Sequence, residues 1–404
     1  MKSNTAKKLL FITTVPETIF FGLEEQIPYL LEQGYDVSAV CSKGSWITIS
    51  DINVKYGIKA YQVEFKRIIS PIHDFLSLLH ITALLFFLRP DIIHASTPKA
   101  ALLSIIGASI TRIPLRIYHN RGIVYQDYKS IAKIFWHSIE KTLCFLSHIV
   151  IVNSASNRQY LQKYNLCPIA KLHMLGSGSS HGIDYVKFNP SNVTISEKEN
   201  LKQSLNIPKD KVVYGFVGRI VKDKGIMDLA EAWKTLLKKN IDAHLILVGP
   251  ITEPRDNIPS DCLKYLNTTP TIHFCSDAKN ARKYYPIFNV FVHPSYREGF
   301  PNVVLEAGAM EIPVITTDAL GCIDSVVDGV TGLIYKTGDC KALANLMFKL
   351  YVDPVLRKKL GKQAREHIIQ YYDPMILCKS LSSLIDNYGN EHQSARIQQK
   401  NGAK

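Results

Sequence analysis

Short apolar segments alternate with longer helix-like segments along most of this chain. This alternation is typical of a parallel sheet whose two faces are both covered by helices. We therefore predict an α/β fold. The expected strands are residues 7–14, 36–42, 91–96, 115–120 and 148–154 in the first half, and residues 211–220, 243–249, 271–275, 290–295 and 313–318 in the second half.

The alternation occurs twice, and a polar segment separates the two occurrences. Residues 191–208 are rich in Asn, Ser and Lys, so we assign them to a linker. We predict two Rossmann-like, doubly wound domains facing each other across a cleft, into which the carboxyl ends of the strands point. The expected boundaries are 1–190 for the first domain, 209–372 for the second, 373–388 for a helix packing back on the first, and 389–404 for a frayed polar tail.

A net positive charge limits the possible partners. The 404 residues include 48 Lys and Arg against 35 Asp and Glu, a formal net charge of +13. Such a surface favours nucleic acid, anionic lipid headgroups or a diphosphate ligand. The sequence has no zinc finger, RNA-recognition signature or arginine-rich tract, so nucleic acid is the least favoured partner. The eight cysteines form no CxxC pair, which is typical of reduced thiols in a cytosolic protein.

The longest apolar run, residues 75–88, bears on membrane association. It contains His80, and it is shorter than the roughly 20 residues that a helix needs to cross a bilayer. We expect a buried or half-buried helix here, and the alternative is a helix lying on a membrane surface. Lys7 and Lys8 lead directly into the first strand, so we expect neither a signal peptide nor a transmembrane segment.

The run HPSYREGFPNVVLEAGAMEIPVITTD carries the most specific functional signal. A strand should turn through Glu298 into a helix capped by Asn302 and ending near Met310. The amino-terminus of a helix binds phosphate, and Glu306 lies one turn inside with its side chain leaning back toward that end. Two carboxylates and an anion site therefore converge, which suits a phosphorylated sugar. The alternative is an ordinary strand–turn–helix connection with solvated acids.

Two cations follow another predicted strand, in the run GFVGRIVKDKG. Arg219 offers a planar fork of donors and Lys224 a point charge, so together they could clamp a diphosphate. The alternative is a solvated surface loop. Their place at a strand end in the same half as Glu298 favours the clamp.

The first half contributes a polar set just past the strand LRIYHN. There His119 could donate a hydrogen bond to a sugar hydroxyl or handle a proton, beside Arg121; the alternative is a structural histidine. Gly22 either lets a ligand approach the backbone or forms a simple turn, and Lys99 follows a strand that should reach the cleft. No histidine spacing matches a metal site. The loop GSGSSHGID, residues 176–184, is predicted to be a hinge.

These motifs resemble those of family 4 glycosyltransferases, the retaining enzymes of GT-B fold. The resemblance covers nearly the full chain through REGFPNVVLEAGAMEIPVITTD, FVGRIVKDKG, LGSGSSHGIDYVKFNP and DIIHASTPKA. The nearest look-alikes are bacterial transferases that build O-antigen, capsule or exopolysaccharide units on a polyprenyl diphosphate carrier.

The resemblance implies a role for each matched residue. Glu306 would hold the ribose hydroxyls of the nucleotide, and Glu298 would contact the donor sugar. Arg219 and Lys224 would neutralise the leaving diphosphate, with His119 placed near the sugar. No bound metal or other cofactor is expected, because these cations and the helix amino-terminus stabilise the leaving group. The loop that wraps the donor would comprise Gly299, Phe300, Pro301, Asn302 and Val303.

The first loop departs from the family pattern. Many relatives carry two adjacent glycines here, whereas the run ETIFFGLEEQ contains Gly22 alone, which weakens its assignment to phosphate binding. The departure fits a polyprenyl-acceptor subgroup in which this loop is bulky and apolar. We assign Phe20 and Phe21 to the acceptor side, together with Lys99 and Arg121.

The expected function is a retaining transfer of sugar from a UDP-sugar to a polyprenyl-diphosphate-linked saccharide in bacterial surface polysaccharide biosynthesis. The protein would be cytoplasmic and peripheral on the inner face of the cytoplasmic membrane. The alternatives are a sugar-nucleotide epimerase or phosphorylase of the same fold, or a non-catalytic assembly scaffold. Donor sugar, acceptor and linkage stay open, because a few pocket contacts decide them.

Overall fold

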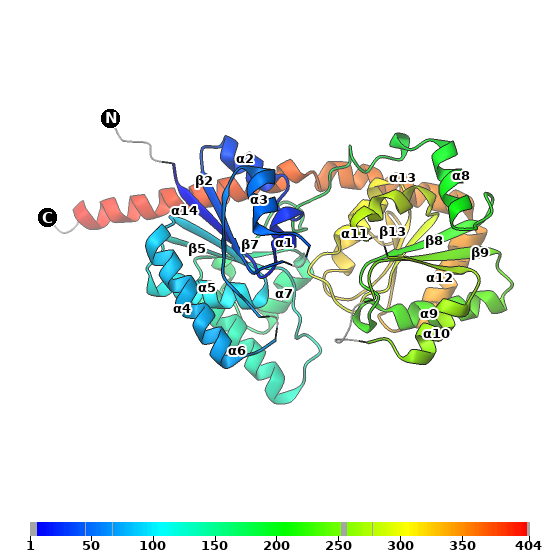
Figure 1. The fold of residues 1–404 in the computed structure, drawn as a ribbon, viewed down its shortest axis with the longest axis horizontal. Helices are drawn as coiled ribbons and strands as arrows, with labels where there is room; N and C mark the ends of the chain where they lie inside the picture. Colours follow the sequence, from blue (N-terminus) through cyan, green and yellow to red (C-terminus); the bar gives the residue numbers. More distant parts are fainter. Residues whose placement is uncertain (1–5, 45, 67, 252–256, 277, 402–404) are drawn as a thin grey trace.

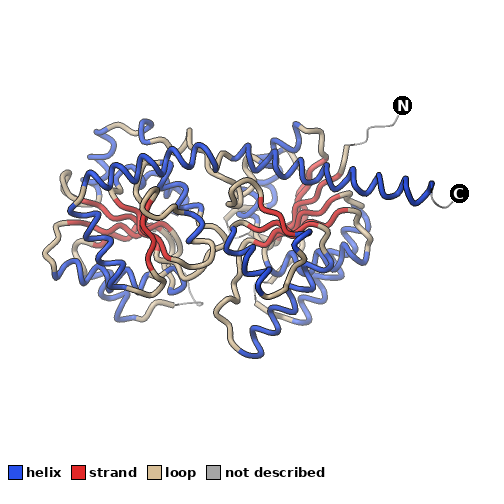
Figure 2. The backbone as a smooth tube through the Cα atoms, turned by 180° about the vertical axis from the view of Figure 1, so that it is seen from behind, coloured by secondary structure: helices blue, strands red, loops and turns tan. Residues whose placement is uncertain are grey.

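The computed structural model describes residues 6–401 apart from 45, 67, 252–256 and 277. Figure 1 shows two α/β units side by side, and a long terminal helix that runs from the second unit back along the first. Figure 2 shows the same arrangement from behind, with the strands of each unit gathered between layers of helices. The predicted pair of parallel-sheet α/β domains is confirmed.

All strands of the first sheet are parallel, in the order β3-β2-β1-β4-β5-β6-β7. The central strand β1 pairs on both sides, so Leu9 lies opposite Val37 and Ile92. The strands are β1 (Lys8–Ile12), β2 (Asp36–Cys41), β3 (Lys59–Gln62), β4 (Ile92–Ser96), β5 (Leu115–Asn120), β6 (Ile149–Val152) and β7 (Leu172–Met174).

The second sheet repeats this topology with six parallel strands, in the order β10-β9-β8-β11-β12-β13. Each sheet reverses its direction of growth beside its first strand, at β1/β4 and at β8/β11. Ligands of doubly wound sheets bind where this reversal occurs. The strands are β8 (Val212–Val217), β9 (Ala243–Val248), β10 (Ile272–Cys275), β11 (Val290–His293), β12 (Val314–Thr317) and β13 (Gly332–Tyr335).

Helices cover both faces of each sheet. In the first unit α4, α5 and α6 share one core with the sheet, and α1 to α3 with part of α14 share the other. The helices are α1 (Pro16–Phe20), α2 (Gln26–Glu32), α3 (Ile49–Tyr56), α4 (Pro71–Leu88), α5 (Pro98–Ile110), α6 (Ser130–Leu146), α7 (Ala155–Lys163), α8 (Ile195–Ser204), α9 (Ile226–Lys238), α10 (Ser260–Thr268), α11 (Asn302–Ala309), α12 (Cys340–Val352), α13 (Pro354–Tyr371) and α14 (Pro374–Asn401).

Apolar spacing and local caps explain why these segments adopt these forms. In α9, Ile226, Leu229, Trp233 and Leu236 recur every three or four residues and are all fully buried. In β6, by contrast, every residue is buried, as expected for a central strand covered on both faces. Helix α3 starts at a capping box in which Thr48 and the third helical residue bond reciprocally.

The ten predicted strands all form, within a few residues of their expected ends. Three further strands were not predicted: β3, β7 and β13. Each lies at the edge of its sheet and is only three or four residues long, too short to give a clear strand pattern, and β3 and β7 are also only partly buried.

The segments around the predicted linker are ordered and packed. Helix α8 occupies most of residues 191–208, and Leu201 packs against the core of the second unit. Helix α14 returns to the first unit, where Leu377, Leu381 and Ile385 enter its core. The backbone of α14 stays helical through Asn401, across most of the segment expected to fray.

The predicted apolar run forms a longer helix than the sequence indicated. Helix α4 has 18 residues with a mean hydropathy of 1.6, so it is long and apolar enough to cross a membrane by length and composition. The prediction that this segment is too short to span is therefore wrong. In the structure α4 packs along α5 through a narrow stripe of Ser77, Ile81 and Leu85, and its other side is exposed.

Candidate active site

The two units touch backbone to backbone where β5 of the first meets the loop after β11 of the second. A Cβ on Gly299 would lie 1.6 Å from the carbonyl oxygen of Arg121, and a Cβ on Gly122 would lie 2.8 Å from Gly299. The amide of Asn157 also donates to the Gly299 carbonyl at 2.8 Å. Only glycine fits so close an approach of two backbones. Both loops follow the carboxyl end of a strand, so the units meet at the carboxyl edges of both sheets.

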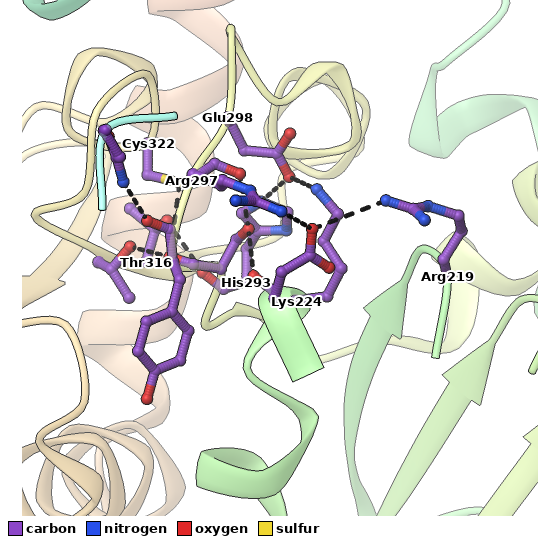
Figure 3. A network of polar contacts seen from close by, with 12 residues as sticks. Arg219, Lys224, His293, Arg297, Glu298, Thr316 and Cys322 are labelled. Atoms are coloured by element: carbon purple, nitrogen blue, oxygen red, sulfur yellow. Dashed lines mark hydrogen bonds and ion pairs between the residues drawn. The ribbon is translucent and has the colours of Figure 1, made fainter. Parts of the chain in front are cut away.

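Glu298 lies in this contact loop, and two basic side chains of the second unit face its carboxylate (Figure 3). The Nζ of Lys224 lies 2.5 Å from its Oε1, and the Nε2 of His293 lies 3.1 Å from the same oxygen. The side chains of Lys224 and Glu298 are only 15% and 18% exposed. The strand ends of β8 and β11 thus build one charge-paired group at the cleft.

The electrostatics of this group keep Glu298 ionised. Burial alone would raise the pKa of the carboxyl, but the Lys224 charge and the hydrogen bond from His293 outweigh it and hold the pKa well below its usual range. An ionised carboxylate only accepts hydrogen bonds. Glu298 is therefore suited to accept bonds from hydroxyl groups rather than to supply a proton.

Arg219 lies at the open end of the same network (Figure 3). Its side chain is 52% exposed, and its guanidinium lies 3.8 Å from the carboxylate of Asp223. That carboxylate also pairs with Arg297 at 3.3 Å, and Arg297 donates to the Val124 carbonyl of the first unit at 3.0 Å. The Arg219 guanidinium is thus loosely paired and can turn toward a ligand, whereas the Lys224 ammonium forms a close ion pair with Glu298.

Glu306 differs from Glu298 in its charge state. Its Oε2 accepts a hydrogen bond of 2.6 Å from the Tyr285 hydroxyl, which also lies 3.4 Å from the Val303 carbonyl. Burial raises the pKa of Glu306 to about 7, although the Tyr285 bond and the Lys187 charge oppose the rise. Near neutral pH this carboxyl is therefore divided between its protonated and ionised forms.

A cavity of about 850 Å³ lies between the units, with Glu306 in its wall. This volume falls in the range that holds a nucleotide-sized ligand. Arg219, Lys224 and Glu298 do not line it, so the described site residues divide into a cavity group and a charge-paired group. Its walls include Phe21, Glu24, Glu25, His181, Asp184, Lys187, Arg282, Lys283, Pro286, Glu306 and Met310.

The loop predicted to wrap the donor lies at the helix start, with one correction. Asn302 is the first residue of α11 and Pro301 is the N-cap, so the prediction that Asn302 caps the helix is wrong. The Asn302 side chain instead accepts a bond of 2.9 Å from the Ser179 hydroxyl, and its amide nitrogen lies 2.6 Å from the His181 ring. The ring of Phe300 is buried against Tyr372.

His119 is buried at the end of β5, with 1% of its surface exposed. Its Nδ1 lies 3.1 Å from His94, and its Nε2 lies 2.6 Å from the Asn153 side-chain oxygen. Burial, with the Arg121 charge next, holds the pKa of His119 well below its usual range, so the ring is neutral. Both ring nitrogens are engaged within the first unit, and contact with a sugar stays a prediction.

Arg121 places a positive charge among these neutral side chains. No described carboxylate lies within ion-pair distance of it, and its buried Nε has no hydrogen-bond acceptor. Burial and the Arg121 charge together lower the pKa of His94 to about 3 and of His181 to about 4. One terminal nitrogen of Arg121 lies 3.4 Å from where a Cβ on Gly22 would stand, so the guanidinium faces that glycine.

Gly22 lies in a turn of the first loop. Helix α1 ends at Phe20, and Gly22 follows it in the turn before α2. A Cβ on Gly22 would also lie 2.6 Å from the Thr18 carbonyl oxygen. The rings of Phe20 and Phe21 pack over the Lys55 ammonium at 4.3 and 5.8 Å, and Phe21 lines the cavity.

Lys99 is not brought together with the other site residues. Its Nζ pairs with Asp74 of α4 at 2.7 Å and donates to the Ile68 carbonyl at 2.5 Å. It therefore ties α5 to α4 and to the segment before α4.

Two contributors to the cleft were missed by sequence reasoning. His181 belongs to the loop predicted as a hinge, yet it lines the cavity and contacts Asn302. Ser156, at the start of α7, bonds the Asp324 carboxylate across the units. A histidine within a glycine- and serine-rich loop was the available signal for His181. Ser156 had none, because its partner is distant in sequence.

No group of three or more His, Cys, Asp or Glu side chains that could hold a metal ion occurs in the part of the chain that the structure describes. All eight cysteines are free thiols.

Both halves of the chain match known glycosyltransferase families. A family profile described as "Glycosyl transferases group 1" matches residues 197–367, and one described as "Glycosyltransferase Family 4" matches residues 23–178. The chain is 33% identical over 387 residues to the capsular polysaccharide biosynthesis glycosyltransferase CapM of Staphylococcus aureus, covering 96% of this chain and 99% of that protein.

Two further similarities concern a relative and a solved structure. The chain is 28% identical to the N,N'-diacetylbacillosaminyl-diphospho-undecaprenol alpha-1,3-N-acetylgalactosaminyltransferase of Campylobacter jejuni, over 82% of this chain and 86% of that one. The structure of Anabaena HepE in complex with UDP and glucose superposes with a TM-score of 0.78 and 17% identity, covering 94% of this chain and 99% of that one. The last likeness concerns the fold.

Proposed function

This chain belongs to glycosyltransferase family 4 and is a glycosyltransferase of GT-B fold, and on that premise we propose that it transfers a sugar from UDP to a lipid-linked saccharide with retention of configuration. The observation that carries the proposal is that a nucleotide-sized cavity and a separate charge-paired group both lie where the two units adjoin. Together they offer a place for each part of a nucleotide sugar.

The cavity would take the nucleoside end of the donor. Glu306 lies in its wall next to the first turn of α11, where a carboxylate can accept bonds from both ribose hydroxyls. Hydroxyl groups on the ligand would favour the ionised form, because hydrogen bonds to a carboxylate lower its pKa. The solved structure of Anabaena HepE, which shares this fold, is a complex with UDP and glucose, which supports a UDP-sugar as the donor.

The diphosphate would lie between the cavity and the charge-paired group. Arg219 is half exposed and loosely paired, so it can turn toward the phosphates. Lys224 already has Glu298 as a counter-ion, which keeps its ammonium placed until the donor arrives. As the bond between the anomeric carbon and the diphosphate oxygen breaks, both cations would stabilise the charge that forms there.

The acceptor would enter from the first unit. Its hydroxyl oxygen bonds to the anomeric carbon on the face that the diphosphate leaves, and its proton passes to the departing phosphate oxygen. The Arg121 guanidinium faces Gly22 and has no described counter-ion, so it suits a phosphate group of the acceptor. Phe21 precedes Gly22 in the sequence, and its side chain, which is 44% exposed, offers an apolar surface for the acceptor.

We assign His119 a positioning role in this scheme. Its bonds to His94 and Asn153 tie β5 to its neighbouring strands, directly before the backbone of Arg121 that meets Gly299. A neutral ring held from both sides orients this edge of the cleft. Its replacement should therefore change turnover together with the geometry of the contact loop.

The names of two relatives support a proposal for the biological setting. CapM is named for capsular polysaccharide biosynthesis, and the Campylobacter enzyme for a diphospho-undecaprenol acceptor. We propose a corresponding step here: addition of a sugar to a polyprenyl-diphosphate-linked saccharide on the inner face of the cytoplasmic membrane. No metal is required in this scheme, because Arg219 and Lys224 supply the positive charge.

A donor and acceptor screen tests the proposal. Purified protein is incubated with a set of UDP-sugars and synthetic polyprenyl-diphosphate sugars, and products are identified by mass spectrometry, with anomeric configuration assigned by NMR. We expect one acceptor to gain one sugar in the donor's own anomeric configuration. UDP titration by calorimetry runs alongside, and failure of the protein to bind UDP, or an inverted product, would contradict the proposal.

A further inference from the structure

The exposed side of α4 is unusually apolar for a helix on a protein surface. Ile72, Phe75, Leu79 and Phe87 are between 52% and 80% exposed, whereas the buried stripe is narrow and starts with a serine, Ser77. Helical spacing places these four residues on one side of the helix. Ordinary surface helices show the reverse, with charged residues outward, and extended apolar patches of this kind mark interaction sites.

Helix α6 extends this apolar surface. Ile131 and Ile134 in its first two turns are 82% and 66% exposed, and Phe145 near its end is 76% exposed. Helices α4 and α6 pack on the same face of the first sheet, on either side of α5, and run along the same flank of the first unit in Figure 1. We call the exposed sides of these two helices the α4–α6 face.

Neither helix exposes an unpaired acid, and lysines lie beside and within the two helices, although the exposed acids Glu64 and Asp127 lie in the segments before them. Helix α4 contains one acid, Asp74, which is paired with Lys99, and α6 contains one acid, Glu140, which is buried. Exposed cations lie at the edges: Lys66 precedes α4, and Lys129 and Lys141 lie before and within α6. An apolar surface with cations at its margin matches an anionic bilayer, whose phosphates lie above its hydrocarbon.

We propose that the α4–α6 face docks on an anionic lipid bilayer, with both helices lying in the interface and the side chains of Phe75, Phe87 and Ile131 entering the hydrocarbon. The proposal deepens the proposed function, because a lipid-linked acceptor requires an enzyme held at the membrane. Lysines at the edge contact lipid phosphates while their stems lie along the apolar side chains.

The packing of α4 favours a helix lying in the interface over a helix crossing the bilayer. Ser77, Ile81 and Leu85 hold α4 against the unit, and Lys99 fastens both Asp74 and the Ile68 carbonyl. A helix held along its length in this way presents one side to lipid. Lys99, which the sequence assigned to the acceptor, thereby supports the docking surface.

The position of this face suits transfer to a membrane-bound acceptor. Residues 121–129 connect the contact loop at Gly299 directly to the start of α6, and Tyr125 in this connection stacks in parallel on Trp136 of α6. The docking surface and the acceptor side of the cleft are therefore joined by one short, packed segment.

Flotation with lipid vesicles tests the proposal. Full-length protein is mixed with phosphatidylglycerol vesicles or with phosphatidylcholine vesicles and centrifuged through a density gradient. We expect wild type to float with phosphatidylglycerol. The double variant Phe75→Gln/Phe87→Gln should lose about tenfold or more in partitioning. Val54→Gln/Val355→Gln, which changes two residues 83% and 77% exposed elsewhere, should float as wild type.

Further measurements distinguish docking on an anionic bilayer from dimerisation through this face and from a helix that spans the membrane. Lys129→Gln/Lys141→Gln should weaken flotation only with anionic vesicles and mainly at low salt. Light scattering without lipid should report a monomer; a dimer that dissociates in the Phe75/Phe87 variant would overturn the proposal in favour of a second copy. Retention on vesicles after an alkaline carbonate wash would overturn it in favour of a spanning helix, and equal flotation of wild type and the Phe75/Phe87 variant would also overturn it.

Calorimetry with UDP separates this proposal from the proposed function. The Phe75/Phe87 variant should bind UDP like wild type, because neither residue lies near the cleft. Wild type that floats but does not bind UDP would contradict the proposed function alone. Wild type that binds UDP but fails to float with phosphatidylglycerol would contradict the docking surface alone.

Discussion

The two sides of the cleft handle buried charge in opposite ways. In the second unit the charges around Glu298 are paired: Lys224 and His293 face Glu298, and Arg297 faces Asp223. In the first unit, Arg121 lies among side chains that are neutral, and no described carboxylate pairs with it.

This difference indicates what each side does before a ligand arrives. A buried ion pair keeps its members in place without help, but the loss of one member leaves the other uncompensated. A buried cation without a partner costs stability, and an anionic ligand that pairs with it removes that cost. The second unit is thus already organised, whereas the first unit lacks an anion that a substrate phosphate can supply.

Removing the cation from the paired side should have the largest effect. Lys224→Ala takes away both the leaving-group charge and the counter-ion of Glu298, so we expect turnover to fall by about 100- to 1000-fold. The free energy of unfolding should also fall, by about 3 kcal/mol, because the Glu298 carboxylate is left buried alone. Initial rates and urea unfolding measure the two effects. Lys222→Ala, an exposed neighbour, is the control and should alter neither.

A substitution that forces the two contact loops apart should have the second-largest effect on activity. Gly299→Ala would place a methyl group 1.6 Å from the Arg121 carbonyl oxygen, so the contact loops must separate. Displacement of reacting groups by about 1 Å can cost around 100-fold in rate. We expect the loss in kcat, with UDP affinity within about threefold of wild type, because the cavity lies mainly beside Glu306. Gly389→Ala in α14 is the control. Unchanged kcat would show that this contact is not needed for turnover.

Replacement of the unpaired cation should separate activity from stability. Arg121→Met should lower kcat/KM for a diphosphate-linked acceptor by about 10- to 100-fold, the effect of one charge-assisted contact. Thermal stability should stay level or rise, in contrast to Lys224→Ala, because no ion pair is broken. The pKa of His181, now about 4, should move up once this charge is gone, which NMR titration can follow. The exposed Arg112→Met is the control, and a large loss of stability would contradict the comparison.

The smallest effect should appear in the pH dependence of donor binding. Burial raises the pKa of Glu306 from 4.5 to about 7, so the folded state favours its protonated form. The stability that this proton contributes is present below the unfolded value and is lost as pH rises through about 7. UDP affinity should rise about tenfold between roughly pH 6 and 8, as the carboxylate that accepts the ribose hydroxyls forms. Glu306→Gln should flatten this profile and Glu311→Gln should not; a flat wild-type profile would exclude an ionised Glu306 as the ribose ligand.

Central elements could be predicted from the chain, and edge elements could not. Strand β5 was predicted with its observed ends, because LRIYHN is a central strand between polar turns. The edge strand β3 escaped prediction, since KAYQ is half exposed and polar. Helix α4 was predicted four residues too short, because proline at its first position starts the helix before the apolar run begins.

The candidate site shows the same division. Glu298, Lys224 and Arg219 could be chosen from strand ends and residue type, and the structure brings them together within one network. His181 and Ser156 could not be chosen, because their partners Asn302 and Asp324 lie more than a hundred residues away. Whether a carboxyl is paired also lay beyond sequence reasoning, and this decides the opposite pKa shifts of Glu298 and Glu306.

The sequence by itself determined the pair of doubly wound sheets and the residue types at their carboxyl edges, since apolar periodicity and turn chemistry are local properties. The tertiary structure alone decided which charges are compensated. Lys224 meets Glu298, Lys99 turns to Asp74, and Arg121 is left without a described partner, although the three cations are alike in their local setting at strand ends. Ion pairing and burial depend on distances between segments far apart in the chain, and only folding sets those distances.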